Sequence, residues 1–315
     1  MDFAQEMKKA SPIFIVGCSR SGTTLLRLML TCHPQICIPP EGPFIIKLMP
    51  KWGNLKISRK SELERLVNDL YQLDKKFKDW GLSKTEVIEA LTKLLPLDFR
   101  AFTSALYGLY MRKKAPGKTR WGDKNPQYVW HMKMLKDLFP KAQFIHIIRD
   151  GRAVYHSFIN ANRKHGKIYP DTPWSAAVYW KSAVNAPNKF LGNRDYIEIF
   201  YEKLVMNPER QLKSICQFLE IDFLPEAMLS FPEANARLNL VPQDKLRWHK
   251  ATLGEVDQGK ALQWQKGLRK HSVFLFELLA GKELERRGYK LVFPLLRTGF
   301  LNDIFTRLVS MRSRQ

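Results

Sequence analysis

Cysteine is scarce in this sequence, which limits both its redox chemistry and its capacity to bind a metal. Among 315 residues there are four cysteines, Cys18, Cys32, Cys37 and Cys216. They form no CxxC pair, and no histidine cluster lies at the spacing of metal ligands, so the pattern argues against a metal site. The simplest interpretation is four reduced thiols in a cytosolic protein, because disulfides are rare in reducing compartments.

Long apolar runs are also missing. No stretch reaches the roughly 20 consecutive apolar residues that a membrane-spanning helix needs. The first residues, MDFAQEMKKASPIFIVG, include two acidic side chains and do not have the pattern of a secretory signal. We therefore expect a cytoplasmic protein.

Acidic residues are few relative to basic ones. The 30 Asp and Glu stand against 52 Lys and Arg, which leaves a formal net charge of +22 at pH 7. Such a charge favours anionic ligands, acidic substrates, nucleic acid or anionic lipid without choosing among them. The basic residues are spread over the chain, and no zinc-finger or RNP signature accompanies them, so we expect no nucleic-acid partner.

The sequence does contain a strand, a loop and a helix that together suit an anion. Residues 12–16 form a continuous apolar run typical of a buried strand, and a largely apolar helix pattern follows the loop. Gly17 and Gly22 permit a tight turn and a close backbone approach, so that N–H groups at the helix N-terminus can point at phosphate oxygens. The loop also supplies two hydroxyl donors and one cation, from Thr23, Thr24 and Arg20.

This loop differs from the Walker A pattern, GxxxxGK[ST], at one decisive position. The string here is GCSRSGTT, and Thr23 stands where Walker A has the lysine that reaches the terminal phosphates. Without this lysine, the loop lacks a residue that a magnesium-nucleotide kinase needs. It still has the glycines, hydroxyls and backbone N–H groups that suit a terminal phosphate or phosphosulfate. Taken alone, the loop equally fits an ordinary turn before a helix. Within it, N–H groups and Arg20 would lower the pKa of the Cys18 thiol, although a small side chain filling the turn is the simpler interpretation.

Strand and helix patterns alternate along the chain, which predicts an α/β fold of three layers, P-loop-like, with helices flanking a central parallel sheet. Strands are expected at 12–16, 119–122, 143–148 and 196–201. Between about residues 56 and 113, three amphipathic patterns at 63–73, 84–95 and 99–111 indicate a helical insertion that covers one edge of the cleft. We expect a single domain over residues 1–290 that includes this insertion.

Further helices are expected later in the chain. Asn125 and Pro126 suit the N-cap and first position of a helix that ends near residue 139. Other helices are predicted at 152–163, 208–220 and 272–287, and the stretch 223–268 is predicted to be mostly loop. Residues 291–315 form a basic amphipathic segment, which suits docking on protein, including a second copy of the chain, better than peripheral contact with a membrane.

Arg149 and Ser157 form a second constellation, in the string IIRDGRAVYHS. Arg149 follows the strand at 143–148, and Ser157 lies two turns into the next helix. Strand carboxyl ends line the ligand crevice of doubly wound sheets, so this pair suits a second phosphate. The alternative is that Arg149 pairs with Asp150 on the surface. Tyr201, at the end of another strand, is positioned either to stack on a nucleobase or to join the core.

The order and spacing of these motifs resemble the sulfotransferase superfamily, whose donor is 3′-phosphoadenosine-5′-phosphosulfate (PAPS). The resemblance covers most of residues 12–290. It implies that the loop holds the 5′-phosphosulfate through Ser19, Arg20, Ser21, Gly22, Thr23 and Thr24. It further implies that Arg149 and Ser157 hold the 3′-phosphate and that Tyr201, in YEKLVMNPE, lies near the adenine.

Within that superfamily, the sequence looks closest to the tyrosylprotein-type and the related bacterial and carbohydrate enzymes. The string HPQICIPPEGPFI places Glu41 where the tyrosylprotein branch has its catalytic base. GDKNP supplies Lys124, similar to the lysine that polarises the transferring group, and Lys266 lies in a late Trp–x–Lys–x–Leu region that the family places near the 3′-phosphate. The RKG motif of the cytosolic small-molecule branch is not seen.

The resemblance implies in-line transfer of a sulfuryl group from PAPS, with no metal, to an acceptor hydroxyl on a glycan, a phenol or tyrosine, or a lipid-linked molecule. Arg20, Lys124 and the loop amides would stabilise charge on the bridging oxygen. Glu41 would accept the hydroxyl proton, and a cleft that excludes water would raise its pKa towards the working range. A P-loop-type small-molecule kinase and a catalytically inactive nucleotide-binding protein are the alternatives.

Overall fold

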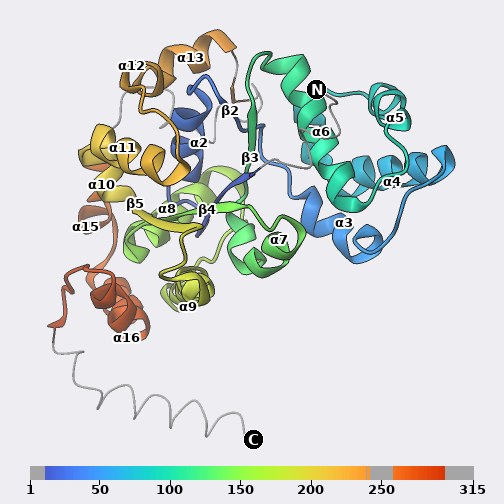
Figure 1. Cartoon of the computed structure of the whole chain (residues 1–315). Helices are drawn as coiled ribbons and strands as arrows, with labels where there is room; N and C mark the ends of the chain where they lie inside the picture. The colour runs from blue at the N-terminus through green and yellow to red at the C-terminus, as the bar shows by residue number, and fades with distance from the viewer. Residues whose placement is uncertain (1–10, 239, 242–257, 295–315) are drawn as a thin grey trace, which may run out of the picture.

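Five parallel strands form the centre of the protein (Figure 1). The computed structural model describes residues 11–238, 240–241 and 258–294. The strands are β1 (Ile13–Gly17), β2 (Ile36–Cys37), β3 (Arg120–Lys124), β4 (Gln143–Ile148) and β5 (Tyr196–Phe200). They lie in the order β2-β3-β1-β4-β5, and each neighbouring pair is parallel. The predicted α/β class with a central parallel sheet is confirmed.

Both faces of the sheet are buried, as the continuous apolar run of β1 predicts. Phe14 and Val16 enter the core on one face, and Ile13 and Ile15 enter the core on the other. The second core is closed by α2 (Thr23–Thr31), α10 (Tyr201–Met206), α11 (Pro208–Leu219) and α12 (Pro225–Leu229). The first core is closed by α7 (Met132–Leu138), α8 (Gly151–His165) and α9 (Pro173–Asn185).

The segment that interrupts the strand and helix alternation is helical, as its three amphipathic patterns predicted. It contains α4 (Lys60–Leu73), η1 (Lys75–Trp80), α5 (Lys84–Thr92) and α6 (Phe99–Lys114), and α3 (Phe44–Trp52) precedes it. These helices gather beside β3, on the side of the sheet away from β5 (Figure 1). Tyr107 of α6 stacks on Trp121 of β3, with ring centroids 4.0 Å apart, and so joins the helical segment to the sheet.

The prediction of mostly loop over residues 223–268 is wrong in its described parts. They contain α12, α13 (Phe231–Leu238), η6 (Gln258–Ala261) and α15 (Trp264–Gly267). Helices this short show little periodicity in a sequence. Tertiary packing stabilises them instead, for Met228 and Phe231 are buried in the core beside α2.

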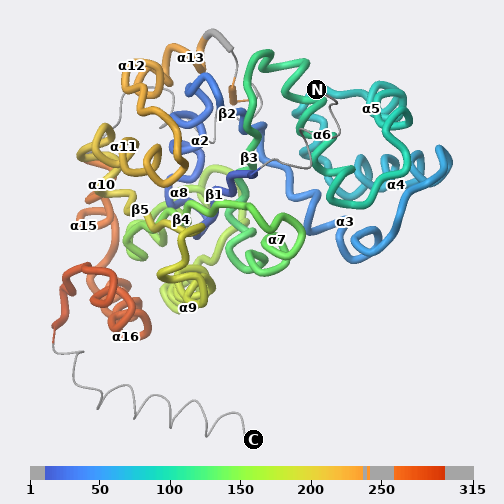
Figure 2. The backbone as a smooth tube through the Cα atoms, viewed as in Figure 1, coloured from blue at the N-terminus to red at the C-terminus, as the bar shows by residue number. Residues whose placement is uncertain are grey.

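Other boundaries also differ from the prediction. The helix expected to end near residue 139 is divided into η2 (Pro126–Trp130) and α7. The Asn125 side chain caps η2 as predicted, since its Oδ1 accepts a hydrogen bond from the Gln127 amide at 3.1 Å. The helix predicted at 272–287 is α16 (Lys270–Arg286), which packs on α8 and α9 (Figure 2).

Two further sequence predictions concern the amphipathic segment at the end of the chain and the absence of a membrane-spanning helix. Of the amphipathic segment at 291–315, residues 295–315 lie outside the described residues. Across the described ranges, we find no helix with both the length and the apolar character needed to cross a bilayer.

Candidate functional site

The carboxyl ends of all five strands lead to the residues singled out from the sequence. In an open parallel sheet these ends share one edge, which is where ligands bind in such folds. β1 leads into the loop that contains Arg20, and Glu41 lies shortly after β2. β3 ends at Lys124, while Arg149 and Tyr201 directly follow β4 and β5. The topology therefore brings motifs that are far apart in sequence to the same edge.

Two glycines in the loop after β1 are required by close contacts. Gly17 and Gly22 have positive φ angles of 149° and 98°. A Cβ on Gly17 would lie 2.4 Å from the backbone oxygen of Ile147, and one on Gly22 would lie 2.4 Å from Cδ2 of Tyr201. Glycine is thus needed both for the turn and for the contact between the loop and the Tyr201 ring.

The loop and the first turn of α2 provide hydrogen-bond donors. The N-cap of α2 is Gly22, with no side-chain cap, and the first turn contains no acidic residue. Ser21 is fully buried, and its Oγ has no hydrogen-bond partner among the described residues. Thr23 is buried and Thr24 is half-buried at the same helix end. The N–H groups of the first helical turn, the helix dipole and these hydroxyls are the features that bind anions at helix N-termini.

Arg20, Ser157 and Arg149 meet beside this loop. Arg20 Nε donates to Ser157 Oγ at 3.2 Å, and Arg149 Nη1 donates to the Arg20 backbone oxygen at 3.1 Å. The Arg149 guanidinium carbon lies 4.3 Å from the centroid of the Tyr201 ring, and its Nε is buried with no hydrogen-bond partner in the described part of the chain. The structure thus assembles the residues predicted from three separate motifs into one cationic cluster.

The alternative in which Arg149 pairs with Asp150 is wrong. The Asp150 carboxylate instead pairs with Arg152, whose Nη2 lies 2.7 Å from Asp150 Oδ2. Arg149 Nη2 donates to the Lys260 backbone oxygen at 2.9 Å. Both hydrogen-bond acceptors of Arg149 named here are backbone oxygens, so neither of them neutralises its positive charge.

Glu41 lies between two lysines. Lys124 Nζ is 2.5 Å from Glu41 Oε2, and Lys76 Nζ is 2.5 Å from Glu41 Oε1. Lys124 comes from β3 and its side chain is 4% exposed, whereas Lys76 comes from η1 and is 48% exposed. The sequence did not single out Lys76, because one lysine in a basic helical segment carries no distinguishing pattern.

The expected rise in the pKa of Glu41 is wrong. Burial does push this pKa upward, but the ammonium groups of Lys124 and Lys76 outweigh it and hold the pKa well below its usual range. Burial lowers the pKa of Lys124 although Glu41 opposes the change, while the charge of Glu41 raises the pKa of Lys76 against the effect of burial. Glu41 is therefore ionised at neutral pH, although the same two ammonium groups make it a weaker base than a free carboxylate.

The short loop around Glu41 is held from both sides by backbone contacts. Trp80 Nε1 donates to the Pro40 oxygen at 3.0 Å, and the Tyr128 hydroxyl donates to the Gly42 oxygen at 3.4 Å. Trp80 belongs to η1 and Tyr128 to η2. The helical segment that follows α3 therefore contributes Lys76 and Trp80 directly to the site.

Tyr179 is a site neighbour that the sequence analysis missed. Its hydroxyl lies 3.2 Å from Ser19 Oγ, and burial is the main cause that raises its pKa to about 12. It belongs to α9, which had not been predicted, and that helix also carries Trp180. Nothing in the sequence pattern links this tyrosine to a loop 160 residues away.

Asp123 forms a buried acidic group directly before Lys124, and it gives a testable prediction. It is 1% exposed and accepts a hydrogen bond from the Tyr107 hydroxyl at 2.6 Å; burial raises its pKa to about 7. In the unfolded chain its pKa is about 3.9. Between these values only the folded state holds the proton, so this group makes the free energy of unfolding fall as pH rises. Asp123→Asn should flatten that dependence and stabilise the protein at pH 8, as measured by urea unfolding at a series of pH values; an unchanged slope would contradict it.

The hypothesis of a reactive Cys18 is wrong. Burial raises the pKa of its thiol far above the usual range, so the interpretation as a small side chain that fills the turn is the one the structure supports. All four cysteines are free. Within the described ranges, the His, Cys, Asp and Glu side chains form no group of three or more that could hold a metal ion.

Lys266 belongs to α15, the short helix Trp264–Gly267. It is exposed in α15, whose Trp264 stacks against the Arg152 guanidinium at 4.1 Å. A Cβ on the neighbouring Gly267 would lie 2.1 Å from Nε2 of His156, so α15 lies directly on α8. A role of Lys266 near a 3′-phosphate stays a prediction.

A parallel sheet with a glycine loop leading from β1 into a helix, and with basic residues at its carboxyl edge, defines a P-loop-like α/β fold. A model of the sulfotransferase family matches residues 12–225, and the chain belongs to that family. The resemblance stated from the sequence is confirmed. The match runs from β1 into α12 and so contains every strand of the sheet.

Individual relatives support the same grouping. The chain is 30% identical over 220 residues to protein-tyrosine sulfotransferase A of Caenorhabditis elegans, covering 68% of this chain and 51% of that protein. It is 28% identical over 240 residues to the protein-tyrosine sulfotransferase of Drosophila melanogaster, covering 74% of this chain and 42% of that protein. The chain thus spans about half the length of the curated relatives it matches.

Solved structures agree on the fold. The sulfotransferase domain of the Synechococcus PCC 7002 olefin synthase superposes with a TM-score of 0.56 at 23% identity. The superposition covers 90% of this chain and 97% of that domain. The shared architecture therefore extends beyond residues 12–225.

Proposed function

We propose that this protein transfers a sulfuryl group from PAPS to an acceptor hydroxyl. The observation that carries the proposal is the contact of Arg149 with both the Arg20 backbone and the Tyr201 ring. It brings two cationic positions together at the carboxyl edge of the sheet, as a donor with phosphates at both the 3′ and 5′ positions requires. The names of the sulfotransferase relatives support the same reaction class.

The residues at the strand ends fit such a nucleotide. Ser21 Oγ and Arg149 Nε are buried donors that lack a partner among the described residues, and phosphate oxygens are strong acceptors. We assign the loop from Ser19 to Thr24 to the 5′-phosphosulfate and the Arg149 and Ser157 side chains to the 3′-phosphate. Tyr201, packed against Gly22, would border the adenine.

The chain's own residues supply the chemistry of an in-line transfer. Glu41, ionised between its two lysines, would accept the proton of the acceptor hydroxyl as the new oxygen–sulfur bond forms. Arg20, Lys124 and the loop amides would stabilise the charge that grows on the 5′-phosphate oxygen as its bond to sulfur breaks. The products are the sulfated acceptor and adenosine 3′,5′-bisphosphate.

We propose a phenolic hydroxyl, tyrosine above all, as the first acceptor to test. The two curated relatives described above are named for protein-tyrosine sulfation. Lys76 adds an exposed positive charge beside Glu41, which favours an acceptor with nearby acidic groups.

The testing experiment is a transfer assay with radiolabelled PAPS. Tyrosine-containing acidic peptides, simple phenols, glycans and lipid-linked alcohols serve as separate acceptors, and label in any of them supports the proposal. Protection against heat by Mg-ATP but not by adenosine 3′,5′-bisphosphate would favour the kinase alternative. Bisphosphate binding with no transfer to any acceptor would instead favour a catalytically inactive nucleotide-binding protein.

Arg149→Ala should weaken the binding of adenosine 3′,5′-bisphosphate by about 10- to 100-fold, the usual effect of losing a charge-assisted contact to phosphate. The bound-state rate of transfer should change much less, because the 3′-phosphate lies away from the reacting sulfur. Isothermal titration and single-turnover kinetics measure the two effects. Arg163→Ala, an exposed arginine at the far end of α8, is the matched control; equal affinity in Arg149→Ala would remove the second phosphate site.

A further inference from the structure

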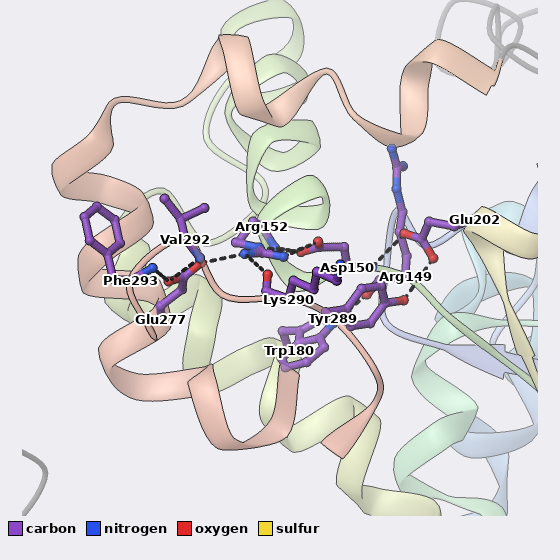
Figure 3. Close-up of polar contacts among 10 residues, drawn as sticks. All are labelled: Arg149, Asp150, Arg152, Trp180, Glu202, Glu277, Tyr289, Lys290, Val292 and Phe293. Carbon is purple, nitrogen blue, oxygen red and sulfur yellow. Dashed lines mark hydrogen bonds and ion pairs between the residues drawn. The ribbon is translucent and has the colours of Figure 1, made fainter. Parts of the chain in front are cut away.

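The RDGR string contains two charged residues that the phosphate assignment leaves unused, Asp150 and Arg152. Both are buried, at 5% and 3% exposure, and the Arg152 guanidinium donates two hydrogen bonds to the Asp150 carboxylate. Arg152 also forms an ion pair with Glu277 of α16 at 2.5 Å (Figure 3). A buried network of charged groups destabilises the folded state unless each polar atom has a hydrogen-bond partner. Arg152 and Glu277 have further partners of this kind.

Those partners lie in a short segment after α16, residues 289–293, which we call the C-terminal strap. Arg152 Nη1 donates to the Lys290 oxygen at 2.9 Å. The Glu277 carboxylate accepts from the amides of Val292 at 3.0 Å and Phe293 at 2.9 Å (Figure 3). The strap lies outside the residues matched by the family model, yet its backbone is bound to the motif that follows β4.

The first residue of the strap reaches the peptide that carries Arg149. The Tyr289 hydroxyl donates to Glu202 Oε2 at 2.9 Å, and Glu202 Oε1 accepts from the Asp150 amide at 2.9 Å. On the other side of the same peptide, Trp180 Nε1 donates to the Arg149 oxygen at 2.9 Å (Figure 3). The peptide between Arg149 and Asp150 is therefore held at its N–H and at its C=O.

Glu202 also links Arg149 to Tyr201, two members of the cationic cluster described above. It directly follows Tyr201, over whose ring the Arg149 guanidinium lies at 4.3 Å. The carboxylate that fixes the Arg149 peptide therefore belongs to the residue next to the ring that fixes the Arg149 side chain. A shift of Glu202 would move both supports of the guanidinium together.

We propose that Glu202 and Tyr289 are positioning residues for Arg149, so that the C-terminal strap completes the binding site for the 3′-phosphate. The proposal rests on the proposed function, since it takes Arg149 as the 3′-phosphate ligand. Neither residue need touch the nucleotide. Their effect is carried by the Asp150 amide and the Arg149 backbone.

The test compares two nucleotides that differ only in the 3′-phosphate, adenosine 3′,5′-bisphosphate and adenosine 5′-phosphate. Tyr289→Phe removes one hydroxyl and keeps the ring. We expect it to weaken bisphosphate binding about 3- to 10-fold, the range for one ordinary hydrogen bond, because the lost hydroxyl acts on Arg149 only through Glu202. Monophosphate binding should stay within about twofold. Tyr71→Phe, which removes a hydroxyl bonded to the Leu82 oxygen in the helical segment, is the matched control and should change neither affinity.

A double-mutant cycle separates positioning from general destabilisation. In the Arg149→Ala background, Tyr289→Phe should have no further effect on bisphosphate affinity, because the group that it positions is gone. Additive losses, or equal weakening of both nucleotides by Tyr289→Phe, would overturn the inference. If Tyr289→Phe does not fold, the isosteric Glu202→Gln provides the same test. An unchanged ratio of bisphosphate affinity to monophosphate affinity in Glu202→Gln would also overturn the inference. If the wild-type protein binds the two nucleotides equally, it has no 3′-phosphate site. That result would contradict the proposed function itself rather than the positioning role of Tyr289.

Discussion

Glu41→Gln is expected to lower kcat by about 10²- to 10⁴-fold, the usual contribution of a general base. Gln has the same size and still accepts hydrogen bonds, but it cannot take up the acceptor proton. The wild-type carboxylate lies beside Lys124 and Lys76, each at 2.5 Å, and carries no proton at neutral pH, as a base requires. Steady-state transfer from PAPS at saturating donor measures the effect.

A matched control and a binding measurement make this test specific. Glu86→Gln removes a carboxylate that also pairs with a lysine in the helical segment, Lys113 at 2.7 Å, and should leave kcat unchanged. The affinity of Glu41→Gln for adenosine 3′,5′-bisphosphate should stay within about threefold of wild type, because Glu41 is assigned to the acceptor side. Near wild-type turnover with normal nucleotide binding would exclude Glu41 as the base.

Lys124→Met should reduce kcat by about 10²- to 10³-fold, the range for losing one donor that stabilises transition-state charge. The Lys124 side chain is 4% exposed, and the residue lies at the end of β3 beside β1, where it is paired with Ile15 in the sheet register. Met keeps the length of the side chain and removes its charge. Single-turnover transfer should show the loss in the chemical step.

The control for Lys124 is Lys136→Met. Lys136 is also partly buried and paired, with Asp195 at 2.8 Å, but Asp195 lies before the amino end of β5, at the opposite edge of the sheet. Its removal should cost stability without changing the transfer rate. A kcat for Lys124→Met within about threefold of wild type would contradict the assigned role.

Much of the fold was predictable because its elements carry strong local signals. The β-branched and aromatic residues of Gln143–Ile148 and the glycine loop after Ile13–Gly17 mark a buried parallel sheet and its first turn. Once the strands are parallel, their carboxyl ends must share an edge, so the meeting of Arg20, Arg149 and Tyr201 follows from topology. The short helices between residues 223 and 268 escaped prediction because tertiary contacts, not periodicity, stabilise them.

The parts of the site that sequence reasoning missed come from helices rather than strand ends. Lys76, Tyr179 and Tyr289 reach the site from η1, α9 and the strap after α16. The direction of the Glu41 pKa was mispredicted because the prediction weighed burial without the ammonium groups of Lys124 and Lys76 beside the carboxylate. Tertiary packing decides which side chain of a basic helix lies next to a carboxylate, and no sequence motif indicates that packing.

The most direct measurement of the central claim is an isothermal titration of the wild-type protein with adenosine 3′,5′-bisphosphate and, separately, with adenosine 5′-phosphate. If two anion sites lie together at Arg20 and Arg149, the bisphosphate should bind at least about tenfold more tightly, as expected for one additional charge-assisted phosphate contact. Equal affinities for the two nucleotides would contradict it.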